Sequence, residues 1–538
     1  MLGLNKNSIK NRDEWTKAGI ETPSFNLDAV AAKTYENPEW VHFGAGNIFR
    51  GFPAALQQKL LNDGKAETGI VAVEAYDFEI IEKIYKPYDN LSLLAIMKPD
   101  GSLENKVIGS ITESLVGDPS HAEDWERLKS IFTKPSLKMA SFTITEKGYS
   151  IRGLMGDYSP IVMQDFANGP EKPVSIMGKI TALAYIRYKH GQMPIALVSM
   201  DNCSHNGEKL CSSVTEIAKK WAENGQVEKG FLDYINNPEK VSFPWSMIDK
   251  ITPRPSDKVK ETLEKIGFKD STIITTTKNT YIATFVNAEG PQYLVIEDHF
   301  PNGRMPLELS GVYFTDRETV DRVERMKVCT CLNPLHTSLA VYGCLLGYNL
   351  IADEMKDPQL KKLVEKVGYV EGMPVVVNPG IIEPSAFIKE VLEIRFPNPY
   401  NPDTPQRIAM DTSQKVGIRF GETIKAYGEM RDLDPKSLNF IPLVIAGWCR
   451  YMMGIDDNGN EMPLSPDPML EMLRSYIAGV KLGDAGTVGD SLRPILSNKQ
   501  IFGSDLYEVG LGEKIEGFFK ELIAGKNAVR NTLVKYLG

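Results

Sequence analysis

Apolar runs of strand length alternate with helical patterns from about residue 38 to residue 300, and this alternation limits the possible folds more than any other feature of the sequence. The strand candidates are Trp40 to Phe43, Ile70 to Val73, Leu91 to Met97, Met139 to Thr145, Ile195 to Ser199 and Ser271 to Thr277. Helical patterns between them include Ser175 to His190 and Glu208 to Asn224, and each stops before a glycine. Such alternation is typical of parallel strands joined by crossover helices, so we expect an α/β fold here.

The pattern changes after Pro301-Asn302-Gly303, and from about residue 319 onward it indicates successive helices with little strand character. Just before the change, Tyr281 to Val286 and Tyr293 to Ile296 look like a hairpin, which would add an antiparallel edge to the mostly parallel sheet. We therefore expect two domains, residues 1–305 with a Rossmann-like α/β fold and residues 306–538 with a mostly α-helical fold.

Charge and apolar patterning exclude several classes of protein. The 538 residues include 61 Lys and Arg against 70 Asp and Glu, a net charge of −9, which argues against a dedicated binder of nucleic acid or of anionic membranes. The N-terminus lacks the apolar core of a signal peptide, so we expect a cytoplasmic protein. Residues 328–352 carry no formal charge, but Asn333, Pro334 and His336 interrupt them, so a loop and a buried helix are expected instead of a membrane span. The pattern makes no prediction of oligomeric state.

A glycine turn follows the first strand of the α/β half. Gly44-Ala45-Gly46 comes directly after the strand, a helical pattern follows, and the second strand ends in Glu74. Small residues let the backbone approach a pyrophosphate, and an acid after the second strand can hold ribose hydroxyls. This predicts a dinucleotide site, with NAD favoured over NADP because a carboxylate repels a 2′-phosphate. The candidate cofactor-binding residues are Gly44, Gly46, Asn47, Phe49, Arg50 and Glu74, with Phe49 in the place of the usual third glycine. A tight turn without a ligand is the alternative.

Polar residues gather where other strands or helices end. Glu146 follows one strand, Asn202 follows another, and Asp249 lies in a Pro-bounded loop. Each one alone is also explained by a surface salt bridge or a plain turn. Lys327, Asn333 and His336 lie around one apolar segment, where packing alone explains them poorly because each buried polar group needs its own partner.

Taken in order, the motifs resemble the polyol-specific long-chain dehydrogenases, the mannitol dehydrogenase and fructuronate reductase group. The motifs are the G-x-G-x-F-x-R turn from Gly44, T-x-T-E-K-G-Y from Thr143, S-x-D-N-x-x-x-N-G from Ser199, F-P-x-x-M-x-D-x-I-T-P from Phe243 and the Lys327…Asn333-x-x-His336 element. The resemblance covers nearly the whole chain, and it makes Phe49 an expected residue.

The resemblance implies a role for each matching residue. Lys327 matches the general base, which takes the alcohol proton as hydride leaves, and Asn202 and Asn333 match amides that donate to the developing oxyanion. His336 and Asp249 match partners of substrate hydroxyls. The remaining matches are Arg407 and Lys415, a basic substrate-binding pair, and Glu146, an acid on the proton path.

The chain departs from the family pattern in one spacing. The family separates the lysine from the asparagine by five residues, whereas Lys327 and Asn333 are six apart. One extra residue turns a side chain by about 100° on a regular helix. Either a π-bulge absorbs it, or the segment is not a regular helix.

These matches lead us to expect a metal-independent, NAD-dependent dehydrogenase that interconverts a ketone and a secondary alcohol of a linear sugar acid or polyol. Reduction of fructuronate to mannonate is the favoured reaction, with mannitol 2-dehydrogenase and tagaturonate reductase as alternatives. A non-catalytic nucleotide-binding sensor is a more distant one. A zinc enzyme would need ligands such as Cys203, His205 and Asp249, which form no ordered motif.

Overall fold

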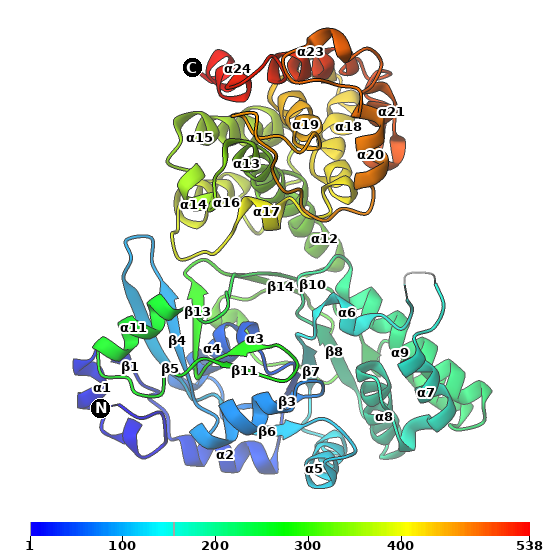
Figure 1. The fold of residues 1–538 in the computed structure, drawn as a ribbon. Coiled ribbons are helices and arrows are strands. Elements are labelled where there is room, and N and C mark those ends of the chain that lie inside the picture. Colours follow the sequence, from blue (N-terminus) through cyan, green and yellow to red (C-terminus); the bar gives the residue numbers. More distant parts are fainter. Residues whose placement is uncertain (1, 154–155) are drawn as a thin grey trace. The chain divides into compact units, whose positions relative to one another are not determined.

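The chain folds into two compact units. The computed structural model describes residues 2–153 and 156–538, and the units comprise residues 1–321 and 322–538 (Figure 1). The division falls after the expected boundary at 305 because strand β15 (Tyr313–Thr315) pairs in parallel with β14 (Tyr293–Glu297) and so belongs to the first unit. The α/β character of the first unit and the helical character of the second confirm the predicted fold class.

A six-stranded, wholly parallel sheet forms the centre of the first unit. Its strands, from edge to edge, are β6 (Ile111–Val116), β3 (Ile70–Glu74), β2 (Trp40–Phe43), β7 (Met139–Phe142), β8 (Ile195–Ser199) and β9 (Val241–Ser242). Every residue of β2, β3, β7 and β8 is buried, as expected where both faces of a parallel sheet are covered. From β2 the chain first adds β3 and β6 on one side and then β7, β8 and β9 on the other side. Open α/β sheets bind their ligands at such a switch point, outside the carboxyl ends of the strands.

Crossover helices cover this sheet and begin and end where the sequence predicts. Helix α8 (Ile176–Lys189) starts after Ser175, whose side chain accepts a hydrogen bond from the Gly178 amide at 2.9 Å. Helix α9 (Asn206–Glu223) ends before Gly225, which has a left-handed φ of 70°. Figure 1 shows α8 and α9 together beside β8.

The predicted hairpin before the domain boundary is wrong. Strand β13 (Phe285–Glu289) pairs in parallel with β4 (Ser92–Met97) in a separate four-stranded sheet, and β14 pairs with β10 (Ser246–Asp249) in a three-stranded sheet. The buried Glu289 side chain at the end of β13 accepts a hydrogen bond from the Ile251 amide at 2.6 Å, so this end is tied to the segment that follows β10. Partners that are distant in sequence thus replace the local pairing.

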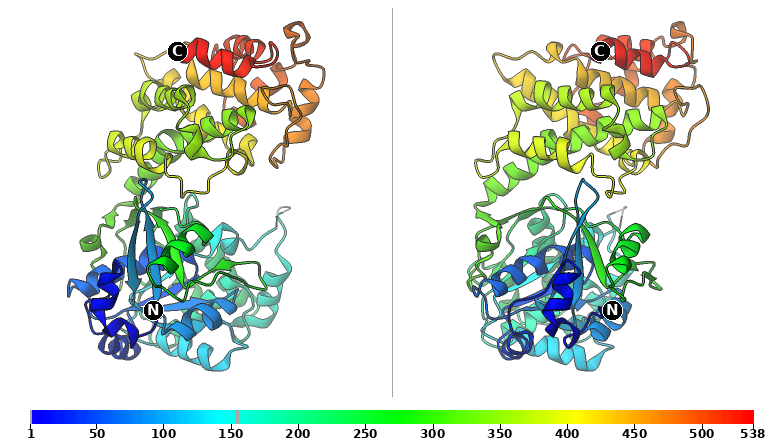
Figure 2. Two further views of the ribbon diagram at one scale, coloured as in Figure 1. Left: turned by 60° about the vertical axis from the view of Figure 1, so that its left-hand side comes forward. Right: turned by 90° about the vertical axis from the view of Figure 1, so that its left-hand side faces the viewer.

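Two buried helices form the core of the second unit. Helix α13 (Asn333–Leu346) contacts α19 (Phe440–Tyr451), where the Tyr342 hydroxyl donates to the Leu443 carbonyl at 2.8 Å. Buried Glu371 accepts hydrogen bonds from three amides at the start of α19. Figure 2 shows the further helices of this unit around them, among them α15 (Pro358–Glu365) and α23 (Gly512–Leu522). Among the described residues, no helix has the length and apolar character to cross a bilayer.

The second unit, all of which is described, also contains four π-helical segments. They are η6 (Lys327–Cys331), η7 (Lys366–Gly372), η9 (Val391–Arg395) and η11 (Gly417–Gly421). Segment η6 contacts both η7 and η11. π-Helices are rare in proteins, and those that occur are often at functional sites. This group therefore makes the surroundings of Lys327 a candidate functional site.

Candidate active site

The glycine turn lies at the carboxyl end of β2, and its two glycines serve different purposes. Gly44 has a φ of 103°, and a Cβ atom there would lie 2.1 Å from the Thr143 carbonyl oxygen of the neighbouring chain segment. Only glycine fits this position. Gly46 has an ordinary φ of −80°, and a Cβ atom there would meet nothing within 4 Å. The first glycine therefore permits the close packing of the sheet, and the second leaves open space next to the backbone.

The side chains that follow the turn point into the unit. Phe49 is fully buried and stacks on His42 of β2 with ring centroids 4.0 Å apart. Arg50 is fully buried as well and donates to the Ala283 carbonyl at 2.8 Å and to the Asn47 side chain at 2.8 Å. Phe49, Arg50 and Asn47 thus support the turn from inside, and the surface left for a ligand is mainly backbone.

Glu74 at the end of β3 also faces the turn. Its carboxylate accepts hydrogen bonds from the amides of Ala45, Tyr76 and Asp77 at 3.0, 2.9 and 3.2 Å. Burial raises the pKa of Glu74, and the three amides oppose that rise. The carboxylate therefore ties the glycine turn to the β3 loop, and its oxygens are occupied by the protein's own backbone.

Asp201, at the end of β8, positions the segment that carries Glu146. It accepts hydrogen bonds from the Ile144 and Thr145 amides at 2.8 and 3.1 Å and from the Tyr149 hydroxyl at 2.6 Å. Thr145 has a left-handed φ of 63°, which is strained for a β-branched residue. Strain held in place by a partly buried acid, beside Glu146, is the pattern expected of a functional turn.

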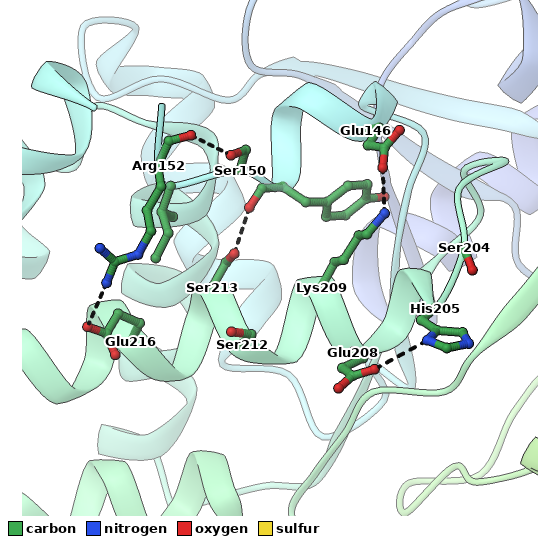
Figure 3. A pocket seen from close by; sticks show the side chains of 12 residues that line it. Glu146, Ser150, Arg152, Ser204, His205, Glu208, Lys209, Ser212, Ser213 and Glu216 are labelled. Atoms are coloured by element: carbon green, nitrogen blue, oxygen red, sulfur yellow. Dashed lines mark hydrogen bonds and ion pairs between the residues drawn. The ribbon is translucent and has the colours of Figure 1, made fainter. Parts of the chain in front are cut away.

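Glu146 lines a groove of about 700 Å³ between α6 (Thr145–Tyr149) and α9 (Figure 3). Its exposed carboxylate is paired with Lys209 of α9. At the same end of the groove His205 stacks on Trp245, with ring centroids 4.3 Å apart, and its Nε2 atom lies 3.2 Å from Asp321 Oδ1. The groove is therefore lined by charged groups of both signs.

The buried side chain of Asn206 links the two chain segments that carry Asn202 and Asp249. The Asn206 side chain donates to the Asp201 and Ser246 carbonyls, both at 3.0 Å, and accepts from the Ser246 amide at 3.0 Å. It thereby joins the loop that follows β8 to strand β10. Asn202 lies exposed in that loop, and Asp249 is buried at the end of β10.

In the second unit, Lys327 is the first residue of the π-helix η6 and is almost fully buried. The Leu332 amide bonds to the Lys327 carbonyl at 3.0 Å, a bond that spans five residues, and α13 then begins at Asn333. Thr423 supports η6 by donating to the Cys329 carbonyl at 3.4 Å. The wide turn takes up the extra residue between Lys327 and Asn333, the first of the two possibilities that the spacing left open.

His336 lies one turn along α13 and is held neutral. Burial lowers its pKa to about 4, and the nearby Arg419, Arg407 and Arg395 act in the same direction against the opposing charge of Asp403. Its Nε2 atom lies 3.5 Å from Asp403 Oδ2, and no described residue makes a hydrogen bond to it. A buried ring nitrogen without a hydrogen bond is ready for a polar ligand atom.

Arg407 lies near this histidine, Lys415 lies near Arg407 and Arg419, and the two have different partners. Arg407 forms an ion pair with Asp403, and the Lys415 ammonium donates to the Met410 carbonyl at 2.6 Å. Burial, followed by the charge of Arg419, lowers the pKa of Lys415. Arg419 itself donates to the Thr337 hydroxyl, and burial lowers its pKa to about 10, so it stays charged at neutral pH.

The predicted site residues thus form two sets, one in each unit. The first unit holds the glycine turn, Glu146, Asn202 and Asp249, and the second holds Lys327, Asn333, His336, Arg407 and Lys415. Sequence reasoning missed Asp201 and Arg419 as parts of these sets. The described residues contain no group of three His, Cys, Asp or Glu side chains that could hold a metal ion.

Two family models match most of the chain. The family model described as the mannitol dehydrogenase Rossmann domain matches residues 38–309, and the one described as the mannitol dehydrogenase C-terminal domain matches residues 319–522. A D-mannonate oxidoreductase of Thermotoga maritima is 60% identical over all of this chain and 99% of its own. A D-mannonate oxidoreductase of Escherichia coli is 29% identical over 87% of this chain and 89% of its own.

A solved structure extends the likeness to the fold. Mannitol 2-dehydrogenase of Pseudomonas fluorescens, solved as a ternary complex with NAD and D-mannitol, matches with a TM-score of 0.70 and 25% identity over 99% of both chains. Together, the two matched models and the fold establish that this chain belongs to the mannitol dehydrogenase family.

Proposed function

We propose that this protein is a D-mannonate oxidoreductase, which interconverts D-mannonate and D-fructuronate with NAD(H). The observation that carries the proposal is the 60% identity to the Thermotoga maritima D-mannonate oxidoreductase over both whole chains. The cation-rich surroundings of His336 support a substrate that bears a carboxylate. The substrates named for the mannitol dehydrogenases among the relatives are uncharged polyols.

The residues of the first unit fit a bound dinucleotide. The open space at Gly46 leaves room for a pyrophosphate against the backbone, and Gly44 allows the turn to lie tight on β7. The bound cofactor would supply a nicotinamide ring that exchanges hydride with the substrate carbon. Because the Glu74 carboxylate already accepts three amide hydrogen bonds, it supports the choice of NAD over NADP less strongly than the sequence suggests.

The residues of the second unit handle the substrate's proton and hydroxyl groups. Lys327 would take the proton of the reacting hydroxyl during oxidation and return it during reduction. Asn333 would donate a hydrogen bond to the oxygen that gains negative charge. The neutral His336, with its unbonded Nε2 atom, would bind another hydroxyl of the sugar chain.

The direct test is an assay of NADH oxidation by the purified protein with D-fructuronate, D-tagaturonate and D-fructose. We expect kcat/KM for fructuronate to exceed the other two by at least about tenfold, with mannonate as the product. Preference for fructose would assign the protein as a mannitol dehydrogenase instead. NADH binding without turnover of any of the three would favour a nucleotide-binding sensor. Repeating the assay with NADPH decides the cofactor preference.

A further inference from the structure

Arg419 sits on a turn that the backbone holds firmly. The π-helix η11 places a glycine on each side of it, and Cβ atoms at Gly417 and Gly421 would lie 2.6 Å from the Ile501 carbonyl oxygen and 2.1 Å from that of Phe502. The turn is therefore pressed against the backbone of α22 (Lys499–Phe502). Its other contacts include η6, which carries Lys327, and α13, which carries His336. Arg419 is thus presented from a fixed position beside the proposed substrate residues.

The guanidinium of Arg419 has few acceptors for a partly buried group. It donates to the Thr337 hydroxyl, and among the described residues no carboxylate or carbonyl oxygen accepts from it. Arginine carries five N–H donors, so most of them have no protein acceptor. Two fully buried arginines differ: Arg187 donates to the carbonyls of Phe132 and Leu137, both at 2.9 Å, and Arg450 to that of Ile455.

The charges around Arg419 do not balance it. His336 lies near Asp403, Arg407 and Arg395 as well as Arg419. Lys415 lies near Arg419, and the carboxylates that act on Lys415 are Asp411 and Asp467. Asp403 is committed to Arg407, and Asp467 accepts hydrogen bonds from the Ser413 amide and hydroxyl. A desolvated cation without its own counter-ion is costly, and an anionic ligand removes that cost.

We propose that Arg419 binds the carboxylate of the sugar acid and thereby selects sugar acids over polyols. A guanidinium offers a planar fork that matches a carboxylate with two parallel hydrogen bonds. Lys415 adds charge beside it, and Thr337 orients the guanidinium. This inference rests on the proposed function, since it names the residue that recognises the acid group of that substrate.

Binding without turnover tests the inference apart from the reaction. D-Mannonate is titrated calorimetrically into the full chain with NADH present, a pair that cannot react because both are reduced. We expect Arg419→Gln to weaken mannonate binding roughly 10- to 100-fold, the effect of losing charged hydrogen bonds. Arg419→Lys should recover only part of the loss because it keeps the charge without the fork. NADH affinity should stay at the wild-type value, and an unchanged thermal unfolding midpoint shows that the second unit of each variant still folds.

The matched control is Lys425→Gln, which removes one positive charge from exposed α18 (Glu422–Glu429) of the same unit and should leave mannonate binding unchanged. Unchanged mannonate affinity in Arg419→Gln would overturn the inference, as would wild-type protein that does not bind mannonate. An equal loss for D-mannitol, which carries CH₂OH in place of the carboxylate, would do the same. Wild-type protein that binds mannonate through Arg419 but never oxidises it would defeat the proposed function and leave the inference standing.

Discussion

The two units hold their predicted site residues in opposite ways. In the first, Phe49, Arg50 and Glu74 face inward and the backbone of the glycine turn is left for a ligand. In the second, charged side chains surround His336, and two of them, Arg395 and Arg419, are carried by π-helical turns. The same contrast appears in two buried acids: Glu74 accepts three amide hydrogen bonds, whereas the oxygens of Glu354 accept none from the described residues. The predicted residues of the first unit thus depend on backbone shape, and those of the second unit depend on charge.

The largest effect is expected when Lys327 of the second unit is replaced. Lys327→Ala should lower kcat roughly 10²- to 10⁴-fold because the variant lacks the proposed general base. NADH affinity, measured by fluorescence titration, should stay close to that of the wild type, since the glycine turn belongs to the other unit. Lys425→Ala, an exposed lysine of the same unit, is the control and should keep full activity. A Lys327→Ala variant with near-normal turnover would disprove the assignment of the base.

The next largest effect is expected on protein stability when Gly44 of the first unit is replaced. Gly44→Ala combines a left-handed φ with a Cβ atom 2.1 Å from the Thr143 carbonyl oxygen, so it should cost clearly more than the about 1–2 kcal/mol of the conformation alone. The matched control is Gly64→Ala, which has a φ of 63° and no atom within 4 Å of the new Cβ. Chemical denaturation measures both. Equal losses of stability would mean that the close approach to Thr143 is not what Gly44 is needed for.

Glu354, the buried acid without hydrogen-bond donors among the described residues, should make the free energy of unfolding depend on pH. Burial raises the pKa of Glu354 well above 4.5, so the folded state holds its proton where the unfolded state has lost it. Its contribution to stability is full below pH 4.5 and falls by up to about 1.4 kcal/mol per pH unit as the pH rises toward the folded pKa. Glu354→Gln should remove this slope from the free energy of unfolding. Glu429→Gln, on an exposed glutamate, should not; a wild-type slope in Glu354→Gln would refute the account.

The smallest effect is expected at Gly46, where the backbone lies next to open space. Gly46→Ala meets no protein atom within 4 Å and has an ordinary φ, so stability should not change. Its methyl group would occupy the space proposed for the pyrophosphate, and NADH affinity should fall roughly tenfold, which corresponds to about 1.4 kcal/mol. Gly290→Ala, also open within 4 Å, is the control. Unchanged NADH affinity in Gly46→Ala would place the cofactor elsewhere.

Parts of the molecule that are defined by local pattern were predictable from the sequence. Four strands of the six-stranded sheet (β2, β3, β7 and β8), the helix after Ser175 and the glycine turn follow from apolar runs and from glycines at set spacings. The edge strands β6 and β9 were not predicted. The π-helical turn at Lys327 was one of two alternatives, because a spacing longer by one residue leaves few ways to keep both side chains in place.

Parts that depend on contacts between distant residues were not predictable. The amides that occupy Glu74 are fixed only when the β3 loop folds against the glycine turn, and β13 and β14 pair with strands far away in the chain. Arg419 stood out in no local motif because its partner Thr337 and its neighbour His336 lie more than 80 residues earlier. A charge without a counter-ion can be recognised only when all its neighbours are known.

The π-helix at Lys327 also bears on how this chain can change its length. A π-helical turn is an α-helical turn with one residue added, and here the addition is absorbed between residues 327 and 331, before the regular α13 begins. Removing one residue from this segment would turn it into an ordinary helical turn and leave the downstream helix intact. We therefore expect that a single-residue insertion or deletion in this segment leaves the positions of the α13 residues in the core unchanged.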